Sequence, residues 1–191
     1  MPGRAFDALA NDLLNNNGMN KIAIFGKPGS GKSTLAKNIY RTTGIPLHPL
    51  DSIVYKANGE FVDRDTYDKE HQSILSSENW IIDGFGPIDS FYQRLEAADT
   101  LIYIDLPYVA SYWLVTKRLA KGFFTTPEGW PEGSSILKGS IASYKALKQS
   151  PKFWNDQFLN RLEDIAKDKN LHIIRSVAEL NSFANKQVLG N

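Results

Sequence analysis

The chain of 191 residues contains no cysteine, and this absence removes several kinds of chemistry at once. Without cysteine there is no disulfide framework, no thiol nucleophile and no thiolate-bound metal. No apolar run approaches the roughly 20 residues that a membrane-spanning helix requires. The start of the chain also lacks the apolar core of a signal peptide, so we expect a cytoplasmic protein that does not bind membranes.

The chain has no excess of charge of either sign. Its 22 basic and 21 acidic residues leave a net charge of +1, and neither charge nor motif predicts specific nucleic-acid binding. The only histidines are His48, His71 and His172; their spacing is not that of metal ligands, so we interpret them as structural. The length favours one globular domain over residues 1–191.

The most informative stretch is a glycine-rich loop between an apolar run and a helical pattern. Residues 22–25 predict a buried strand, and apolar residues return at helical spacing from Leu35. Between them lies an intact G-x-x-x-x-G-K-[ST] motif followed by a threonine: Gly26, Lys27, Pro28, Gly29, Ser30, Gly31, Lys32, Ser33 and Thr34. This order of strand, loop and helix is that of a P-loop.

The residue types of this loop predict nucleotide chemistry. We expect residues 26–34 to bind ATP through backbone N–H groups and the positive end of the following helix. Lys32 is predicted to be catalytic and to contact the β- and γ-phosphates, and Ser33 to be a Mg²⁺ ligand. The alternative, a glycine-rich turn with a surface lysine, does not explain why the full motif and its flanking elements coincide.

Strand and helix patterns alternate along the rest of the chain, which predicts an α/β fold with a parallel sheet. Further strands are expected at about 45–51, 80–84, 100–105 and 171–175. The first of these holds two prolines and is therefore expected at or near a sheet edge. Helices are expected at about 63–77, 88–97, 107–122, 134–148, 153–167 and 177–183.

Two segments extend this regular alternation. Residues 1–19 carry apolar residues at helical spacing and predict an N-terminal helical extension. Residues 122–133 are rich in glycine and proline, and a stretch of this kind in a compact domain is usually functional or mobile. We therefore expect a lid-like insertion at about 120–150.

Acidic residues end three of the expected strands, where ligands bind in open α/β sheets. Asp83 follows the apolar residues 80–82 and is expected to hold Mg²⁺, with a strand-end cap as the alternative. Asp51 is expected to be catalytic, as the group that orients the substrate hydroxyl or accepts its proton; a turn-initiating aspartate is the alternative. We interpret Asp105 as structural, because Pro107 and a helix start follow it.

Four residues are cationic candidates for the transferring phosphate: Arg64, Arg94, Lys117 and Arg118. Arg118 lies just before the turn-rich stretch, so closure of that stretch would bring it over the phosphate, and we predict a catalytic role for it. Surface arginines are abundant, which leaves a plain surface role as the alternative for each.

Taken in order, these motifs resemble the adenylate-kinase-like P-loop proteins that are often labelled DNA topology modulation protein. The resemblance extends over about residues 20–183. The segments that carry it are residues 26–34, His48-Pro49-Leu50-Asp51, Trp80-Ile81-Ile82-Asp83-Gly84, residues 94–100, Ile104-Asp105-Leu106-Pro107 and Ile173-Ile174-Arg175-Ser176. The resemblance implies a three-layer nucleotide-kinase fold, with a five-stranded parallel sheet in the order 2-3-1-4-5 and helices on both faces.

The resemblance also implies transfer of the γ-phosphoryl group of ATP to a small acceptor, with a nucleotide or nucleoside as the leading class. Asp51, Asp83 and Arg94 would bind the substrate, with Asp83 also at the magnesium and Arg118 at the phosphates. Residues 83–87 are similar to the Asp-Gly-Phe-Pro-Arg segment of true adenylate kinases but lack its arginine. AMP is therefore not favoured as the acceptor.

Two other functions stay open at this point. A P-loop GTPase is one, because Asp83-Gly84-Phe85-Gly86 satisfies D-x-x-G, although no guanine-specific N-K-x-D follows. The other is a non-enzymatic ATP-binding regulatory protein, which would close on ATP and present a surface to a partner. Comparing ATP with GTP binding separates the first, and turnover with an acceptor separates the second.

Overall fold

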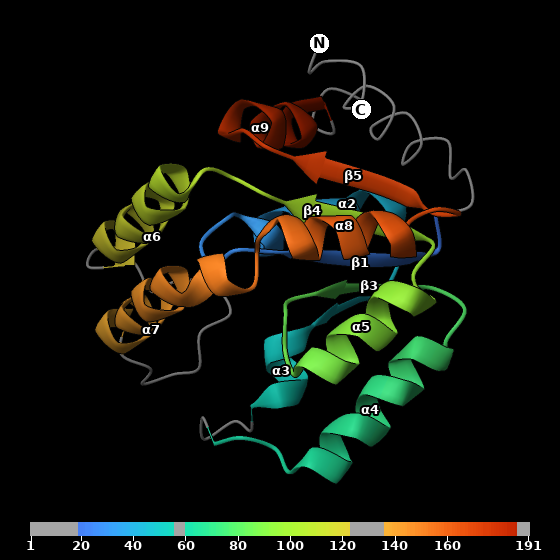
Figure 1. Ribbon diagram of the computed structural model, residues 1–191. Helices are drawn as coiled ribbons and strands as arrows, with labels where there is room; N and C mark the ends of the chain where they lie inside the picture. Colours follow the sequence, from blue (N-terminus) through green and yellow to red (C-terminus); the bar gives the residue numbers. More distant parts are fainter. Residues whose placement is uncertain (1–18, 56–59, 123–135, 187–191) are drawn as a thin grey trace.

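The computed structural model describes residues 19–55, 60–122 and 136–186, which form a three-layer α/β structure (Figure 1). The strands are β1 (Lys21–Gly26), β2 (Leu47–Pro49), β3 (Trp80–Asp83), β4 (Thr100–Ile104) and β5 (Asn170–Ile174). The helices are α2 (Lys32–Thr43), α3 (Leu50–Val54), α4 (Arg64–Ser76), α5 (Ile88–Ala97), α6 (Tyr108–Gly122), α7 (Ile136–Gln149), α8 (Asp156–Ile165) and α9 (Val177–Lys186). The expected N-terminal helix and the turn-rich residues 123–133 lie outside the described residues.

The five strands are parallel and lie in the order β2-β3-β1-β4-β5, which confirms the predicted fold. β1 is central, and its register places Ile24 beside Asp83 of β3. β2 is an edge strand, as its prolines predict, because proline cannot donate to a second neighbouring strand. The carboxyl ends of β1, β2 and β3 therefore meet at one edge of the sheet.

Alternate residues of β1 build two separate cores. Ile22 and Ile24 pack with apolar residues of α2 and α9 on one face of the sheet. Ala23 and Phe25 pack on the other face with residues of α3, α4, α5 and α8 (Figure 1). Because both faces are covered, the strand is apolar throughout and not alternating. This double burial holds the glycine-rich loop at the end of β1 on a rigid support.

Two boundaries differ from those predicted. Asp51 was expected to end a strand, but it lies in the first turn of α3, directly after β2. Helix α8 was expected from residue 153 and begins at Asp156, because the Asn155 side chain accepts a hydrogen bond from the backbone N–H of Phe158 at 3.0 Å. Within the described ranges, no helix is both long and apolar enough to cross a membrane.

Candidate active site

The glycine-rich loop leaves β1 in a conformation that only glycine adopts without strain. Gly26 has φ 143°, and a Cβ atom there would lie 2.3 Å from the carbonyl oxygen of Ile104. Helix α2 then begins at Lys32 with no side-chain hydrogen bond at its N-cap, Gly31, and no acidic residue in its first turn. Its first N–H groups therefore have no capping side chain, which is the arrangement that binds an anion.

Lys32 folds back over this loop. Its Nζ atom donates to the backbone oxygen of Lys27 at 2.7 Å. Burial lowers the pKa of Lys32, the carboxylates of Asp83 and Asp51 oppose that shift, and Arg118 adds to it. The structure thus brings four of the predicted site residues, Lys32, Asp51, Asp83 and Arg118, into one electrostatic environment.

Asp83 ends β3 and is buried. Burial raises the pKa of Asp83, while the charge of Lys32 and a hydrogen bond from the Ser33 hydroxyl lower it. Its Oδ1 atom has no hydrogen-bond partner among the described residues. A buried carboxylate oxygen without a donor, beside a hydroxyl, is a set of hard oxygen ligands that fits Mg²⁺. We call residues 26–34 together with Asp83 the phosphate side.

No group of three or more His, Cys, Asp or Glu side chains that could hold a metal occurs in the part of the chain that the structure describes. A Mg²⁺ ion at Ser33 and Asp83 would therefore take further oxygen ligands from water and from nucleotide phosphates. This sharing is usual for Mg²⁺, which is often bound through one or two protein groups and the substrate.

Lys27 was predicted to belong to the phosphate cradle, and its side chain lies elsewhere. The side chain is almost fully buried and forms an ion pair with Asp105. Its Nζ atom also donates to the backbone oxygen of Leu106 at 2.9 Å and lies 4.8 Å from the ring centre of Tyr108. The Lys27 side chain therefore ties the glycine-rich loop to the connection between β4 and α6, and Asp105 has the structural role expected of it.

Arg118 lies on α6, and its guanidinium is held by the neighbouring helix. Its Nη2 atom donates to Ser143 Oγ of α7 at 2.7 Å, and burial lowers the pKa of Arg118. A second contact, 2.6 Å between the Thr116 and Tyr144 hydroxyls, joins the same two helices. No motif pointed to Ser143, because its position beside Arg118 depends on how α7 packs on α6.

Arg94 was expected to face the acceptor, but it is fully buried on α5. Its Nη2 atom donates to the backbone oxygens of Gly84 at 3.0 Å and Phe85 at 2.9 Å. Burial lowers the pKa of Arg94 to about 10, while Tyr67 and Asp83 oppose that shift. The Nη2 group thus holds the connection between β3 and α5, while the buried Nη1 atom has no hydrogen-bond partner among the described residues.

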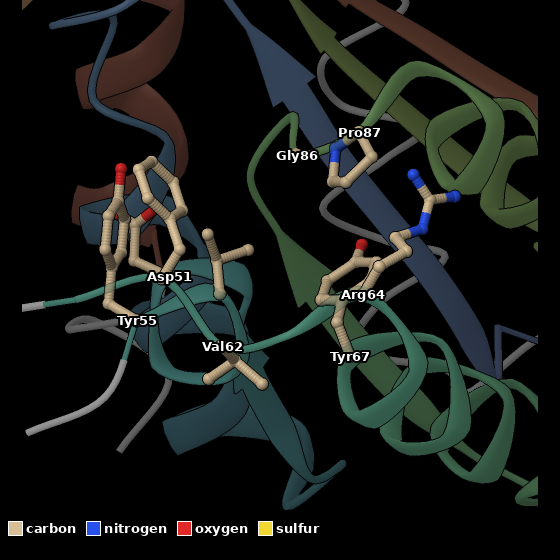
Figure 2. A pocket seen from close by; sticks show the side chains of 9 residues that line it. Asp51, Tyr55, Val62, Arg64, Tyr67, Gly86 and Pro87 are labelled. Carbon is tan, nitrogen blue, oxygen red and sulfur yellow. The ribbon is translucent and has the colours of Figure 1, made fainter.

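A pocket of about 320 Å³ lies next to Asp51. Figure 2 shows Asp51 and Tyr55 on one side of it and Arg64, Tyr67 and Pro87 on the other. We call this pocket the acceptor side; it is lined by Asp51, Val54, Tyr55, Phe61, Val62, Arg64, Tyr67, Gly86 and Pro87. Of these residues, sequence analysis had assigned a substrate role only to Asp51 and had considered Arg64 for the phosphate, because the lining comes from three separate segments.

Comparison with solved structures identifies the architecture. A shikimate kinase from Acinetobacter baumannii, solved in complex with shikimate, has 12% sequence identity and a TM-score of 0.55, with 94% of each chain covered. A shikimate kinase from Bacteroides thetaiotaomicron has 16% identity and a TM-score of 0.51, with 90% of this chain and 98% of that chain covered. The chain has a P-loop kinase fold.

One further solved structure and one family model also match the chain. A gluconokinase from Sinorhizobium meliloti 1021 has 15% identity and a TM-score of 0.48, with 90% of each chain covered. A family model described as the NB-ARC domain matches residues 3–56, a minor part of the chain that includes the glycine-rich loop. The comparison with curated proteins gives no match.

Proposed function

We propose that this protein is a Mg²⁺·ATP-dependent phosphotransferase that acts on a small acceptor, with a nucleotide or nucleoside as the leading class. The observation that carries the proposal is the position of Asp51. It lines the acceptor side, and its charge acts on Lys32 and Asp83 of the phosphate side. One carboxylate is thus available to an acceptor hydroxyl and lies close to the place where a γ-phosphate would be held.

The phosphate side would bind ATP through the free N–H groups of the glycine-rich loop and of the first turn of α2. Lys32 would leave its contact with the Lys27 carbonyl and donate to the β- and γ-phosphates. Ser33 and Asp83 would hold Mg²⁺, the first directly and the second directly or through water. The bound ion would neutralise charge that develops on the transferring phosphoryl group.

In the proposed reaction, the γ-phosphoryl group of ATP on the phosphate side passes to an acceptor hydroxyl on the acceptor side. The acceptor hydroxyl oxygen forms a bond to the γ-phosphorus, the bond from that phosphorus to the β,γ-bridging oxygen breaks, and ADP leaves. Asp51 orients the hydroxyl and accepts its proton, as a carboxylate does in other kinases. Arg118 offers positive charge to the transferring group, and Ser143 keeps its guanidinium in place.

Two further groups would act at a distance. Arg94 is a positioning residue, because it holds the carbonyls of Gly84 and Phe85, next to the pocket-lining residues 86–87. The segment at about 120–150, which includes α7, would form a lid within a single domain of residues 1–191.

The order of motifs along the chain supports a place among the adenylate-kinase-like proteins labelled DNA topology modulation protein. We expect the protein to act in the cytoplasm.

The proposal is tested by coupled ADP release with Mg²⁺·ATP across nucleosides, nucleoside monophosphates and small hydroxylated metabolites. Lys32→Ala is expected to lower acceptor-dependent release at least about 100-fold, since it removes a preorganised charge from the transition state. Lys167→Ala is the matched control, because this lysine is exposed and pairs with Asp164 on the surface. Unchanged release in Lys32→Ala would overturn the proposal, and ATP binding without release would favour the regulatory alternative.

A further inference from the structure

The wall of the acceptor side is built from two aromatic rings. The chain leaves α3 at Val54 and returns at Val62, whose N–H donates to the Val54 carbonyl at 2.9 Å. Beside this bond, Tyr55 and Phe61 form an isolated antiparallel bridge, and their ring centres lie 4.9 Å apart. Both rings are more than 40% exposed, unlike the buried aromatic core under the sheet. The pocket thus presents flat apolar surface that a ligand can cover.

Apart from Asp51 and Arg64, the rest of the lining is also largely apolar. Val54, Val62 and Pro87 contribute aliphatic surface, and the Tyr67 ring lies across the pocket from Tyr55 (Figure 2). The volume of about 320 Å³ lies at the small end of the range for small-molecule sites. A compact ligand with one ring system therefore suits this space better than an extended one.

The two charged side chains of the described lining, one acidic and one basic, differ in where they point. Asp51 contributes a carboxylate, and Arg64 is the one cationic residue among the lining residues that the structure describes. The Nε atom of Arg64 donates to both carboxylate oxygens of Asp68, at 2.9 and 2.8 Å. In Figure 2 its guanidinium points away from Asp51. The other arginine of this region, Arg94, is buried and does not line the pocket; its Nη2 atom donates to backbone carbonyls, and its Nη1 atom has no partner among the described residues.

An acceptor that carries a phosphate or carboxylate needs cationic donors aimed at it, most often from arginine in a forked geometry. The described lining offers a carboxylate near the aromatic wall and directs its one guanidinium elsewhere. A negatively charged ligand would meet repulsion from the Asp51 carboxylate in this lining. A neutral ligand with a hydroxyl group would instead satisfy Asp51 and cover the rings.

We infer that the acceptor is a neutral nucleoside, whose base packs against Tyr55 and Phe61 and whose sugar hydroxyl lies on Asp51. The inference rests on the proposed function and narrows its acceptor class. In the transfer, the sugar hydroxyl oxygen bonds to the γ-phosphorus of ATP, its proton passes to Asp51, and ADP departs. The product is a nucleoside monophosphate.

Binding is measured by titration calorimetry on the full chain, separately from turnover. The probes are adenosine, guanosine, cytidine, uridine and thymidine, their 5′-monophosphates, and shikimate as a carboxylate-bearing alcohol. At least one nucleoside is expected to bind more tightly than its monophosphate and than shikimate. Phe61→Ala is expected to weaken that nucleoside about tenfold, the usual effect of losing a base-stacking ring. Tyr40→Ala is the matched control, because Tyr40 is an exposed aromatic on α2, outside the pocket lining.

Arg64→Gln separates a nucleoside from a nucleotide acceptor. For a nucleoside acceptor we expect this substitution to change the Kd of the nucleoside less than the Kd of its 5′-monophosphate, because a guanidinium interacts more strongly with an anionic group than with a neutral ligand. Tighter binding of a monophosphate or of shikimate, with a tenfold loss in Arg64→Gln, would overturn the inference. Failure of every nucleoside to bind would also overturn it.

The proposed function and this inference fail in distinguishable ways. Nucleoside binding that depends on Phe61, without ADP release, would contradict the kinase and leave the site assignment standing. ADP release that depends on Lys32 and on a different acceptor would support the kinase and overturn the nucleoside.

Discussion

The phosphate side and the acceptor side of this molecule are built in opposite ways. The phosphate side is nearly one continuous segment, residues 26–34, and much of it is backbone whose shape depends on glycine. The acceptor side comes from α3, from the start of α4 and from the connection between β3 and α5, and its character lies in side chains. The glycine-rich loop is thus a local motif of the sequence, whereas the pocket is assembled from residues that are distant along the chain.

The largest effect expected to separate the two sides comes from their carboxylates. Asp51→Asn should lower kcat at least about 100-fold and lower ATP affinity far less, because it removes the proton acceptor and not a nucleotide contact. Asp83→Asn should instead weaken Mg²⁺·ATP binding by about 10- to 100-fold. Both are measured by ATP titration and by single-turnover transfer.

Equal loss of ATP affinity in the two variants would contradict this separation and make Asp51 part of the phosphate side. Asp68→Asn is a suitable control, because this carboxylate lies on α4 and pairs with Arg64 at the surface. It should leave both ATP affinity and kcat within about twofold, as expected for an exposed pair.

Next to the acceptor side, a buried histidine is expected to make the free energy of unfolding depend on pH. His71 is buried on α4 and its ring stacks on Tyr67, 5.6 Å between centres. Burial, with a smaller effect of Arg94, lowers the pKa of His71 to about 4. Between pH 6.5 and 4 the unfolded chain therefore binds a proton that the folded chain does not, and stability falls as the pH decreases. From pH 7.5 to pH 5 this contribution is about 2 kcal/mol.

The measurement is urea unfolding of the wild type and of His71→Phe at both pH values. The variant keeps an aromatic ring beside Tyr67 and lacks the titrating group, so it should lose about 2 kcal/mol less on acidification. The same pH dependence in both proteins would show that His71 is not the cause. His172→Phe, on β5, controls for loss of a histidine as such.

A smaller effect is expected inside the phosphate side, where two lysines of one loop differ in role. Lys27→Met and Asp105→Asn should each lower the free energy of unfolding, and the double variant should lose less than the sum by about 1 kcal/mol, because the residues form one ion pair. Thermodynamic coupling is measured by a double-mutant cycle in urea. Strict additivity would show that the pair does not stabilise the loop.

The smallest effect is expected at the helix pair α6 and α7. Ser143→Ala should lower kcat by about threefold and leave ATP affinity unchanged, because it removes one hydrogen bond of about 0.5–1.5 kcal/mol and leaves the Arg118 charge in place. In an Arg118→Ala background the same change should have no further effect on kcat. A second loss in that background would show that Ser143 acts other than through Arg118.

The architecture could be predicted from sequence because its causes are local. Apolar runs such as residues 22–25 predict buried strands, and the alternation of strands with helices leaves few ways to order a parallel sheet. The prolines at 46 and 49 predicted the edge strand. The observed start of α8 lies three residues after the predicted one. The Asn155 side chain caps the helix there, and the spacing of apolar residues does not show such a cap.

The site divides in the same way. Its nucleotide motif and the strand-end acids were visible in the chain, since a P-loop needs particular residues at fixed spacing. The contacts of Lys27 with Asp105, of Arg94 with two carbonyls, and of Arg118 with Ser143 were not visible. Each of these contacts joins two segments whose proximity neither a motif nor hydrophobic periodicity predicts. The direction in which a charged side chain points also cannot be predicted from residue spacing.

The sequence by itself determined the fold class and the position of the glycine-rich loop, because these follow from hydrophobic periodicity and from glycine's freedom at residues such as Gly26, while the strand order was implied by the resemblance that the motifs carry. Tertiary structure alone decided which side chains line the pocket. Packing of α3, α4 and the β3–α5 connection places Tyr55, Phe61 and Tyr67 around one space beside Asp51. Pocket chemistry depends on distances between side chains that are remote along the chain, and only the folded protein sets those distances.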